Sequence, residues 1–420
     1  MTKLTTTKTT MQDLGSGSGA GSLGINTKFV AVGLKRVVWH PRGVNVSELA
    51  NDDLRVYRRA LRWQRLRAVQ WLFDKPIPYL RKNLDGIMTR YMKQARVAKC
   101  YRVRIKNHVE VWRSKEHRRA HYKNLMVCGS VWTCPVCSAK ISERRKIELS
   151  TAPRLDSFSR FMVTFTIQHN RGDRLKDLHA DLVAGIQTMK KTWGYKILVK
   201  RLQIVGTVRG LEVTVSNVNG WHPHIHELAF SKLPQGEIDA DELRAELSRL
   251  FVLAMQKRGR YVHSEIGVNV RTDNVLASYV AKMGEGEKWG VVAELTKSPV
   301  KTGRGEDHFH PFELLDMVLS KNKDAARMFI EYAVSLKGKR QLSYSKGLRA
   351  LLGLDVEISD QEIAERIDAD AGLFAMIEPD HWRKIIQYEK RAEVLEVAST
   401  GNYVAFVAWM RAIGCKDFGL

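Results

Sequence analysis

The chain lacks any apolar run of about 18 residues or more, the length that a membrane-spanning helix requires, so the sequence excludes such a helix. The opening MTKLTTTKTT is polar and leads into a stretch rich in Gly and Ser, so we expect no secretory signal. Only 5 cysteines occur in 420 residues, which is too few for a disulfide scaffold. We therefore expect a cytoplasmic protein with no membrane partner.

Acidic residues are scarce relative to basic ones. The chain has 69 Lys and Arg against 45 Asp and Glu, a formal net charge of +24. Residues 51–150 alone hold 25 Lys and Arg against 8 Asp and Glu, which is +17 of that excess. Uncompensated like charges destabilise a folded domain, so this segment predicts contacts with the phosphate backbone of DNA. The helix predicted from Asp52 onward carries Arg55, Arg58, Arg59, Arg62, Arg65 and Arg67.

The residue pattern divides the chain into five segments. Residues 1–24 are rich in Thr, Ser and Gly, and we expect a flexible tail. After the tail we predict a basic helical segment, a zinc-binding module, a sheet-containing domain and a mostly helical C-terminal region. The predicted bounds of these four segments are 25–95, 96–150, 151–300 and 301–420.

Strand and helix patterns follow one another through the sheet-containing domain. FMVTFTIQH has an apolar residue at every second position, which is the period of a strand with one buried face. A helical pattern, two strand-like runs around the turn-rich residues 217–220, a second helix and the strand IGVNVRT come next. This order predicts an α+β fold with an antiparallel sheet flanked by helices.

Three of the five cysteines are closely spaced in VCGSVWTCPVCSAKI. A Cys-Pro-x-Cys knuckle directs two thiolates at one ion, and a structural Zn²⁺ site takes four ligands. We predict Cys100 as the fourth ligand, with His117 or His121 as substitutes. Four protein ligands close the site to substrate, so its role is structural. The three spaced cysteines are Cys128, Cys134 and Cys137.

A second metal-ligand pattern lies in WHPHIHELAF. Side chains alternate along a strand, so His222, His224 and His226 project from one face. Two imidazoles two residues apart can chelate one divalent ion. Glu212, in the preceding run GLEVTVS, would be brought beside them by a hairpin. Two imidazoles and a carboxylate leave positions open for a substrate oxygen, so we predict a catalytic metal site.

A third pattern, ASYVAKM, places Tyr279 and Lys282 three residues apart on a predicted helix, where they are neighbours on one face. A Tyr-x-x-Lys pair alone is a weak signal. Its position after IGVNVRT, a strand that could lie in the sheet of His224 and His226, adds weight to it.

These patterns together resemble the rolling-circle plasmid replication initiators of the HUH endonuclease superfamily. The resemblance runs from about Cys100 to Leu354, in the order CGSVWTCPVCSAKI, FMVTFTIQH, HPHIH and ASYVAKM. The later GRGEDHFHPFELL and KGKRQLSYSKGLRALLG are similar to downstream blocks of the same group. The resemblance implies that residues 151–300 form an HUH endonuclease domain and does not cover residues 355–420.

The resemblance implies an enzyme that nicks one strand at the plasmid double-strand origin. A divalent metal, Mg²⁺ or Mn²⁺, held by His224 and His226 would polarise the scissile phosphate, with Glu212 as a third ligand. Tyr279 would attack the phosphorus of the single-stranded scissile strand, giving a 5′-phosphotyrosine and a free 3′-OH, with Lys282 as an electrostatic helper. The implied partners are the origin DNA, a host helicase, a single-strand binding protein and a DNA polymerase.

Two positions leave the assignment open. Some members of the family carry a glutamate one helical turn before the tyrosine, where this chain has Val275, so the residue that drives the terminating cleavage is undetermined. His222 shares the face of the predicted ligands and could instead form a hydrogen bond beside them.

Two alternatives differ in what they explain. An HUH transposase or a conjugative relaxase would use the same chemistry. A non-catalytic, zinc-containing DNA-binding regulator would account for the basic segment and the cysteines, but it leaves HPHIH and YVAK unexplained.

Overall fold

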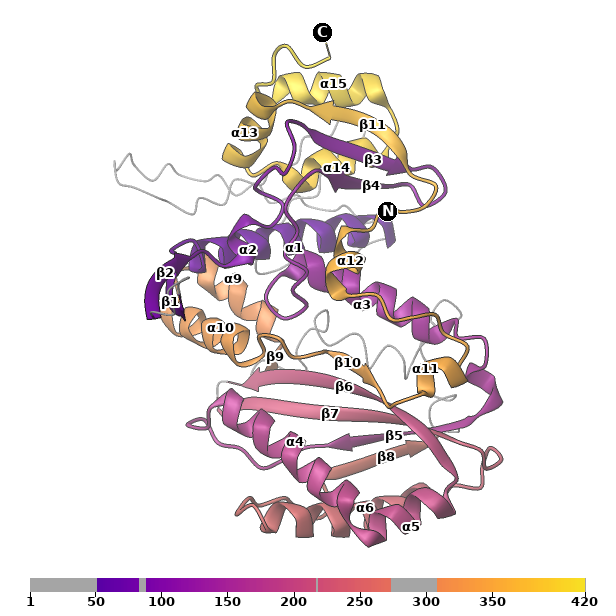
Figure 1. Ribbon diagram of the computed structural model, residues 1–420. Coiled ribbons are helices and arrows are strands. Elements are labelled where there is room, and N and C mark those ends of the chain that lie inside the picture. The colour runs from indigo at the N-terminus through magenta and orange to yellow at the C-terminus, as the bar shows by residue number, and fades with distance from the viewer. Residues whose placement is uncertain (1–50, 83–87, 217, 273–307, 420) are drawn as a thin grey trace, which may run out of the picture.

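The computed structural model describes residues 51–82, 88–216, 218–272 and 308–419. Helices and antiparallel sheets make up these ranges, so the predicted α+β class is confirmed. Figure 1 shows the largest sheet toward one end of the molecule, a three-stranded sheet toward the other, and helices between them. Among the described helices, none combines the length and apolar composition that crossing a bilayer requires.

The largest sheet has the strand order β10-β6-β7-β5-β8, and β9 also pairs with β6. Every pairing is antiparallel, as predicted, and the long β6–β7 hairpin forms the centre. The strands are β5 (Ser159–Phe165), β6 (Ile204–Ser216), β7 (Gly220–Ser231), β8 (Val268–Thr272), β9 (His308–Phe309) and β10 (Leu342–Tyr344). Three helices pack on one face of it: α4 (Leu175–Lys191), α5 (Trp193–Arg201) and α6 (Ala240–Gln256).

Side-chain alternation gives the two faces of β7 different surroundings. Trp221, Ile225 and Ala229 are buried in the main core, on the face that the helices cover. Leu228 and Phe230, on the opposite face, belong to a second, smaller core. The short helix α11 (Leu348–Leu351) and the end of α3 (Pro135–Ser150) supply the apolar cover there.

The histidines follow directly on the face that carries this smaller core. His222, His224 and His226 continue the row of Leu228 and Phe230 along β7. Among the described residues, the apolar cover of the smaller core stops at Leu228 on this strand. Polar side chains therefore occupy one half of a face whose other half is apolar.

The three-stranded sheet joins segments that are far apart in the sequence. β11 pairs with β3, and β3 pairs with β4 on its other side. Helix α14 packs against β3 and β4. A hairpin alone is marginal in water, and this third strand with its helices buries Val109 and Val111. The elements are β3 (Val109–Ser114), β4 (Arg119–Lys123), β11 (Gly372–Ile377), α13 (Pro379–Gln387), α14 (Arg391–Ser399) and α15 (Tyr403–Ala412).

Strand pairing in the sheets joins residues from different predicted segments. The C-terminal region, predicted as mostly helical from residue 301, supplies β10 to the largest sheet and β11 to the sheet of the cysteine-rich segment. The basic segment was predicted to be helical, but Ile77–Lys82 (β1) and Met88–Lys93 (β2) form an antiparallel hairpin. Pro76 and Pro78 disfavour a helix in this part of the chain, because proline lacks the N–H that a helix interior needs.

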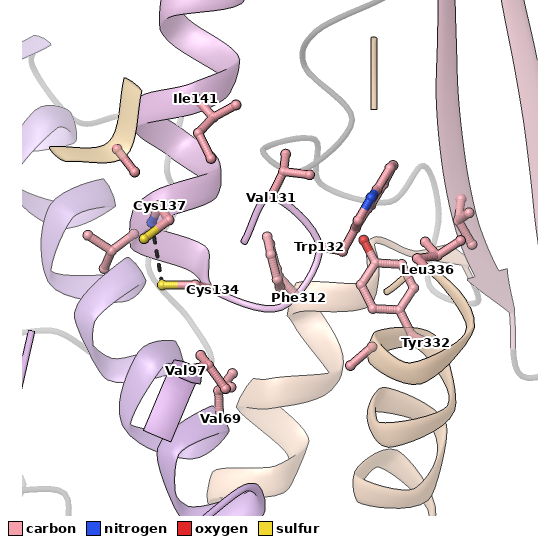
Figure 2. Packing of buried hydrophobic residues seen from close by; sticks show 14 of the residues in the cluster. Val69, Val97, Val131, Trp132, Cys134, Cys137, Ile141, Phe312, Tyr332 and Leu336 are labelled. Carbon is pink, nitrogen blue, oxygen red and sulfur yellow. Dashed lines mark hydrogen bonds between the residues drawn. The ribbon is translucent and has the colours of Figure 1, made fainter. Parts of the chain in front are cut away.

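Helix α1 (Asn51–Leu72) lies between the two ends of the molecule and contacts α2 (Arg96–Lys99), α3 and α14. It also contacts α9 (Leu314–Leu319), which precedes α10 (Lys323–Ser335). Figure 2 shows this core from close by. Val69, Val97, Cys134 and Cys137 lie toward the left of the view, Phe312 lies near its centre, and Tyr332 lies toward the right. This packing makes the cysteine-rich segment part of the main core.

Tyr332 links that core to the sheet. Its ring meets Trp132 edge-on with centroids 6.2 Å apart and stacks on Trp221 at 6.1 Å. Trp221 is the residue before His222 on β7, so the cysteine-rich segment and the histidine strand share one aromatic cluster.

Candidate metal centres

Strands β6 and β7 bring one carboxylate and two imidazoles together. Glu212 lies directly opposite His224 in the register, and His226 is the next residue on the same face of β7. Oε2 of Glu212 lies 2.9 Å from Nε2 of His226. One ligand atom from each of the three residues lies within 4.8 Å of the other two. This donor set could hold a divalent cation, with coordination positions left for oxygen atoms of a substrate.

Strand β5 adds a hydroxyl that orients one of these imidazoles. Thr164 lies opposite His226, and its Oγ1 is 2.9 Å from Nδ1 of that ring. Holding Nδ1 in this way leaves Nε2 directed at Glu212, which fixes the nitrogen that a metal would meet. His226 and Glu212 are buried and His224 is half-buried, so the cluster reaches the surface on the His224 side.

His222 lies beside the cluster. Its Nε2 is 2.9 Å from Nε2 of His224 and 2.7 Å from Oγ1 of Thr166. His222 is thus a hydrogen-bonding neighbour of a predicted ligand, which is one of the two roles that the sequence left open. The grouping of three ligand atoms found in the structure includes Glu212, His224 and His226.

Three residues of this region were missed by the sequence analysis. The His169 ring lies beside that of His222, with centroids 4.4 Å apart and the planes tilted by 36°, and its Nδ1 lies 2.9 Å from the Asn219 carbonyl oxygen. Thr164 and Thr166 occupy the polar positions of FMVTFTIQH. The same alternation that identified the apolar face of this strand could have identified them, because the residues between apolar ones share the opposite face.

Tyr279, Lys282 and Val275 lie outside the described residues. The strand before them is β8, and the structure confirms that it belongs to the sheet of His224 and His226, since Asn269 pairs with Thr164.

Four cysteines meet at a buried point around the start of α3. Sγ of Cys100 lies 3.6 Å from Sγ of Cys137 and 3.8 Å from Sγ of Cys134, and Sγ of Cys128 lies 3.7 Å from that of Cys137. Cys134 caps α3, where its sulfur accepts the N–H of Cys137, the contact drawn in Figure 2. The structure therefore brings together the four predicted ligands, including the one distant in sequence.

The spacing of these sulfurs suits zinc. Four thiolates held tetrahedrally at about 2.3 Å from Zn²⁺ would be about 3.8 Å from one another. Burial raises the pKa of the Cys100 and Cys134 thiols, whereas hydrogen bonds from the neighbouring cysteine sulfurs lower the pKa of Cys137. The predicted substitutes have other neighbours: Nε2 of His121 is 2.7 Å from Asp368, and a ring nitrogen of His117 lies within 4.8 Å of carboxylate oxygens of Glu116 and Asp370.

Several basic residues of α1 are used inside the fold. Arg65 makes a two-pronged pair with Asp316 at 2.6 and 2.9 Å. Nε of Arg59 lies 2.9 Å from Glu396, whose side chain is only 6% exposed. These two arginines, expected to face DNA, instead attach α1 to α9 and α14. Burial lowers the pKa of Arg62 to about 10, whereas Arg58 is exposed.

Comparisons with known proteins give a partial likeness. The chain is 29% identical over 322 residues to "Protein rep" of Streptomyces lividans, which covers 59% of this chain and 69% of that protein. It is 28% identical over 126 residues to "Protein rep" of Bacillus amyloliquefaciens and 32% identical over 135 residues to "Neomycin resistance protein" of Streptomyces cyanogenus. The chain spans 35% and 30% of the length of these two proteins. No family model matches the chain, and no solved structure matches it.

Proposed function

We propose that this chain is a plasmid replication initiator that nicks one DNA strand through a tyrosine and a divalent metal. The cluster of Glu212, His224 and His226 is the observation that carries the proposal, because it combines an open imidazole-carboxylate donor set with a partly exposed position. The similarity to two proteins named "Protein rep" supports the replication role.

In this proposal His224, His226 and Glu212 hold Mg²⁺ or Mn²⁺, which when bound withdraws charge from the non-bridging oxygens of the scissile phosphate. Thr164 keeps the His226 ring in the orientation that binding needs. His222 forms a hydrogen bond with His224, and this contact limits rotation of the His224 ring. These residues come from adjacent strands, so the backbone ladder fixes their positions before substrate arrives.

Tyr279 is the proposed nucleophile. Its hydroxyl oxygen forms a bond to phosphorus and loses its proton as the bond from phosphorus to the 3′ oxygen breaks. The leaving 3′ oxygen takes up one proton and becomes the free 3′-OH, so the numbers of bonds and protons are conserved. The product is a 5′-phosphotyrosine, which retains a phosphodiester that a later 3′-OH can attack when strands are rejoined. Lys282 is the proposed electrostatic helper. A tyrosine hydroxyl has an ordinary pKa of about 10, so a nearby cation favours its attack at neutral pH.

The cysteine-rich and basic segments would bind and orient the DNA. We propose that Cys100, Cys128, Cys134 and Cys137 hold a structural Zn²⁺ and that the basic segment contacts phosphates of the origin duplex. The proposed enzyme then hands the free 3′-OH to a host DNA polymerase, with a helicase and a single-strand binding protein acting on the opened strands.

A covalent-adduct experiment tests the proposal. The purified full chain is incubated with single-stranded DNA from each strand of its own replicon, with Mn²⁺ or with EDTA, and run on a denaturing gel. The expected result is a protein–DNA band that needs Mn²⁺ and is lost in Tyr279→Phe and in His224→Ala. Cys415→Ser, at a buried cysteine remote from the cluster, is the matched control and should keep the band.

Two results would count against the proposal. The absence of a band on either strand, with salt-sensitive DNA binding intact, would support a zinc-containing DNA-binding regulator. A metal-dependent band that survives Tyr279→Phe would support the nicking activity but show that the nucleophile is another residue.

A further inference from the structure

Helix α5 exposes a tryptophan among lysines on the side of the sheet away from the histidines. Trp193, the first residue of α5, is 79% exposed. Lys196, Ile197 and Lys200 follow at helical spacing and are exposed, and Lys191 precedes them at the end of α4. We call these five residues the α5 surface. Residues three, four and seven apart share one helix face, so the tryptophan and lysines form a continuous stripe.

The packing of α5 fixes this stripe outward. Leu198 is buried beneath it. Gly194 lies so close to α6 that an added Cβ would meet Cδ2 of Leu250 at 3.0 Å. Thr192 caps the helix by accepting the N–H of Tyr195. The backbone of α5 is thus held against α6, and Trp193 lies on its exposed face.

The lysines of the α5 surface, Lys191, Lys196 and Lys200, form no ion pairs with acidic groups among the described residues. The neighbouring Lys190, by contrast, is paired at 2.7 Å with the buried Glu227. Arg201, at the far end of α5, is paired with Glu242 and Glu246. The acids of α6 therefore meet Arg201, and the stripe around Trp193 stays basic.

An exposed indole ring set among unpaired lysines is complementary to single-stranded nucleic acid. Unpaired bases stack on aromatic side chains while lysines follow the phosphates, whereas the bases of a duplex are already stacked. By contrast, lysine is depleted at the centre of protein–protein interfaces relative to the rest of the protein surface. The charge of the stripe thus favours a nucleic-acid strand over a protein partner.

We propose that the α5 surface binds single-stranded DNA at a second site, separate from the nicking site. The α4–α6 layer covers the face of β7 that holds Trp221 and Ile225, while His224 and His226 lie on the opposite face. Figure 1 shows α5 and α6 at the end of the molecule farthest from the C-terminus. Given the proposed function, on which this step rests, the strand that the α5 surface binds is the one opened at the origin.

The test uses the full chain and an oligothymidine of about 16 nucleotides, which contains no origin sequence. Fluorescence anisotropy compares the wild type with Trp193→Ala, Trp193→Phe and the double variant K196A/K200A. Loss of a stacking side chain is expected to weaken binding roughly tenfold, with Phe restoring most of it. Binding is also measured at several salt concentrations. In the lysine variant, the slope of log K against log salt concentration is expected to be less steep by about 0.7 for each phosphate contact removed. The double variant K337A/K416A, at two exposed lysines outside the α5 surface, is the charge-matched control for K196A/K200A.

A cross-linking arm locates the DNA directly. Oligothymidine carrying 5-iodouracil is irradiated with the protein, and mass spectrometry identifies the joined peptide, which we expect to contain Trp193. Unchanged affinity in Trp193→Ala together with a cross-link elsewhere would overturn the inference. Unchanged DNA binding with impaired plasmid replication in that variant would also overturn it, in favour of a protein partner.

The same samples separate this inference from the proposed function. Covalent-adduct formation on an origin oligonucleotide is measured in parallel and should persist in Trp193→Ala. Loss of the adduct in every sample would count against the nicking proposal and leave the affinity comparison intact. Adduct formation with no affinity difference would count against the α5 surface alone.

Discussion

Oε2 of Glu212 lies 2.9 Å from Nε2 of His226, across the β6–β7 ladder and on the face opposite the helices. The two residues are 14 positions apart in the sequence and are both buried. A buried carboxylate beside an imidazole is the arrangement that a divalent cation would bridge, with each residue supplying one ligand atom.

Replacing Glu212 by Gln should weaken binding of Mn²⁺ by at least about tenfold, because the amide keeps the shape of the side chain and removes its charge. Electron paramagnetic resonance of free Mn²⁺ would measure this affinity without any DNA. Thermal unfolding of the metal-free variant should change little. An unchanged Mn²⁺ affinity would remove Glu212 from the ligand set.

Thr164→Val should weaken Mn²⁺ binding by roughly tenfold, since it removes the hydroxyl that holds Nδ1 of His226. Thr188→Val is the matched control, because it removes a hydroxyl on α4 that donates to the Ala184 carbonyl oxygen and lies away from the histidines. The control should leave Mn²⁺ affinity nearly unchanged. Equal losses in the two variants would show that the contact between Thr164 and His226 does not support metal binding.

Cys100→Ser should release zinc and destabilise the chain, because a structural zinc site contributes its binding free energy to folding. Elemental analysis of the purified protein should give about one zinc per chain, with a clear loss in this variant. Cys415→Ser, a buried cysteine outside the cluster, should keep the zinc. Full zinc content in Cys100→Ser would contradict the assignment.

Arg65→Ala should lower the free energy of unfolding by about 1–2 kcal/mol, since it breaks a two-pronged, half-buried pair with Asp316. The double variant R65A/D316A should lose less than the two single variants combined. Arg58→Ala, at an exposed arginine of the same helix, should leave stability unchanged and reduce DNA affinity. Urea unfolding and anisotropy with origin duplex would distinguish these roles.

His179 should make the protein less stable in mild acid. Burial, with Lys339 and Arg209 nearby, lowers the pKa of His179 to about 4, against about 6.5 for an ordinary histidine. Between these values the unfolded chain binds a proton that the folded chain does not, so stability falls as the pH drops through this window. In urea unfolding at pH 7 and pH 5, His179→Asn should show a smaller loss than the wild type. The same pH dependence in both would assign the effect to other groups.

Side-chain patterns in the sequence account for the local features of the two candidate metal sites. Alternation along β7 placed His222, His224 and His226 on one face, and the predicted hairpin brought Glu212 opposite His224. The short spacing of Cys128, Cys134 and Cys137 indicated one ion, and the structure brings Cys100 to them. These features depend on contacts within a strand, a turn or a hairpin, and the periods of side-chain direction are visible in the sequence.

The long-range relationships follow from how the helices and strands pack together. The pairing of β11 with β3, the ion pair of Arg65 with Asp316, and the packing of Tyr332 between Trp132 and Trp221 join residues that are distant along the chain. A local pattern records that a side chain is apolar or charged but does not name its distant partner. The arginines of α1 show this most clearly: their charge is visible in the sequence, and whether each meets a carboxylate or the solvent depends on how the C-terminal helices pack around α1.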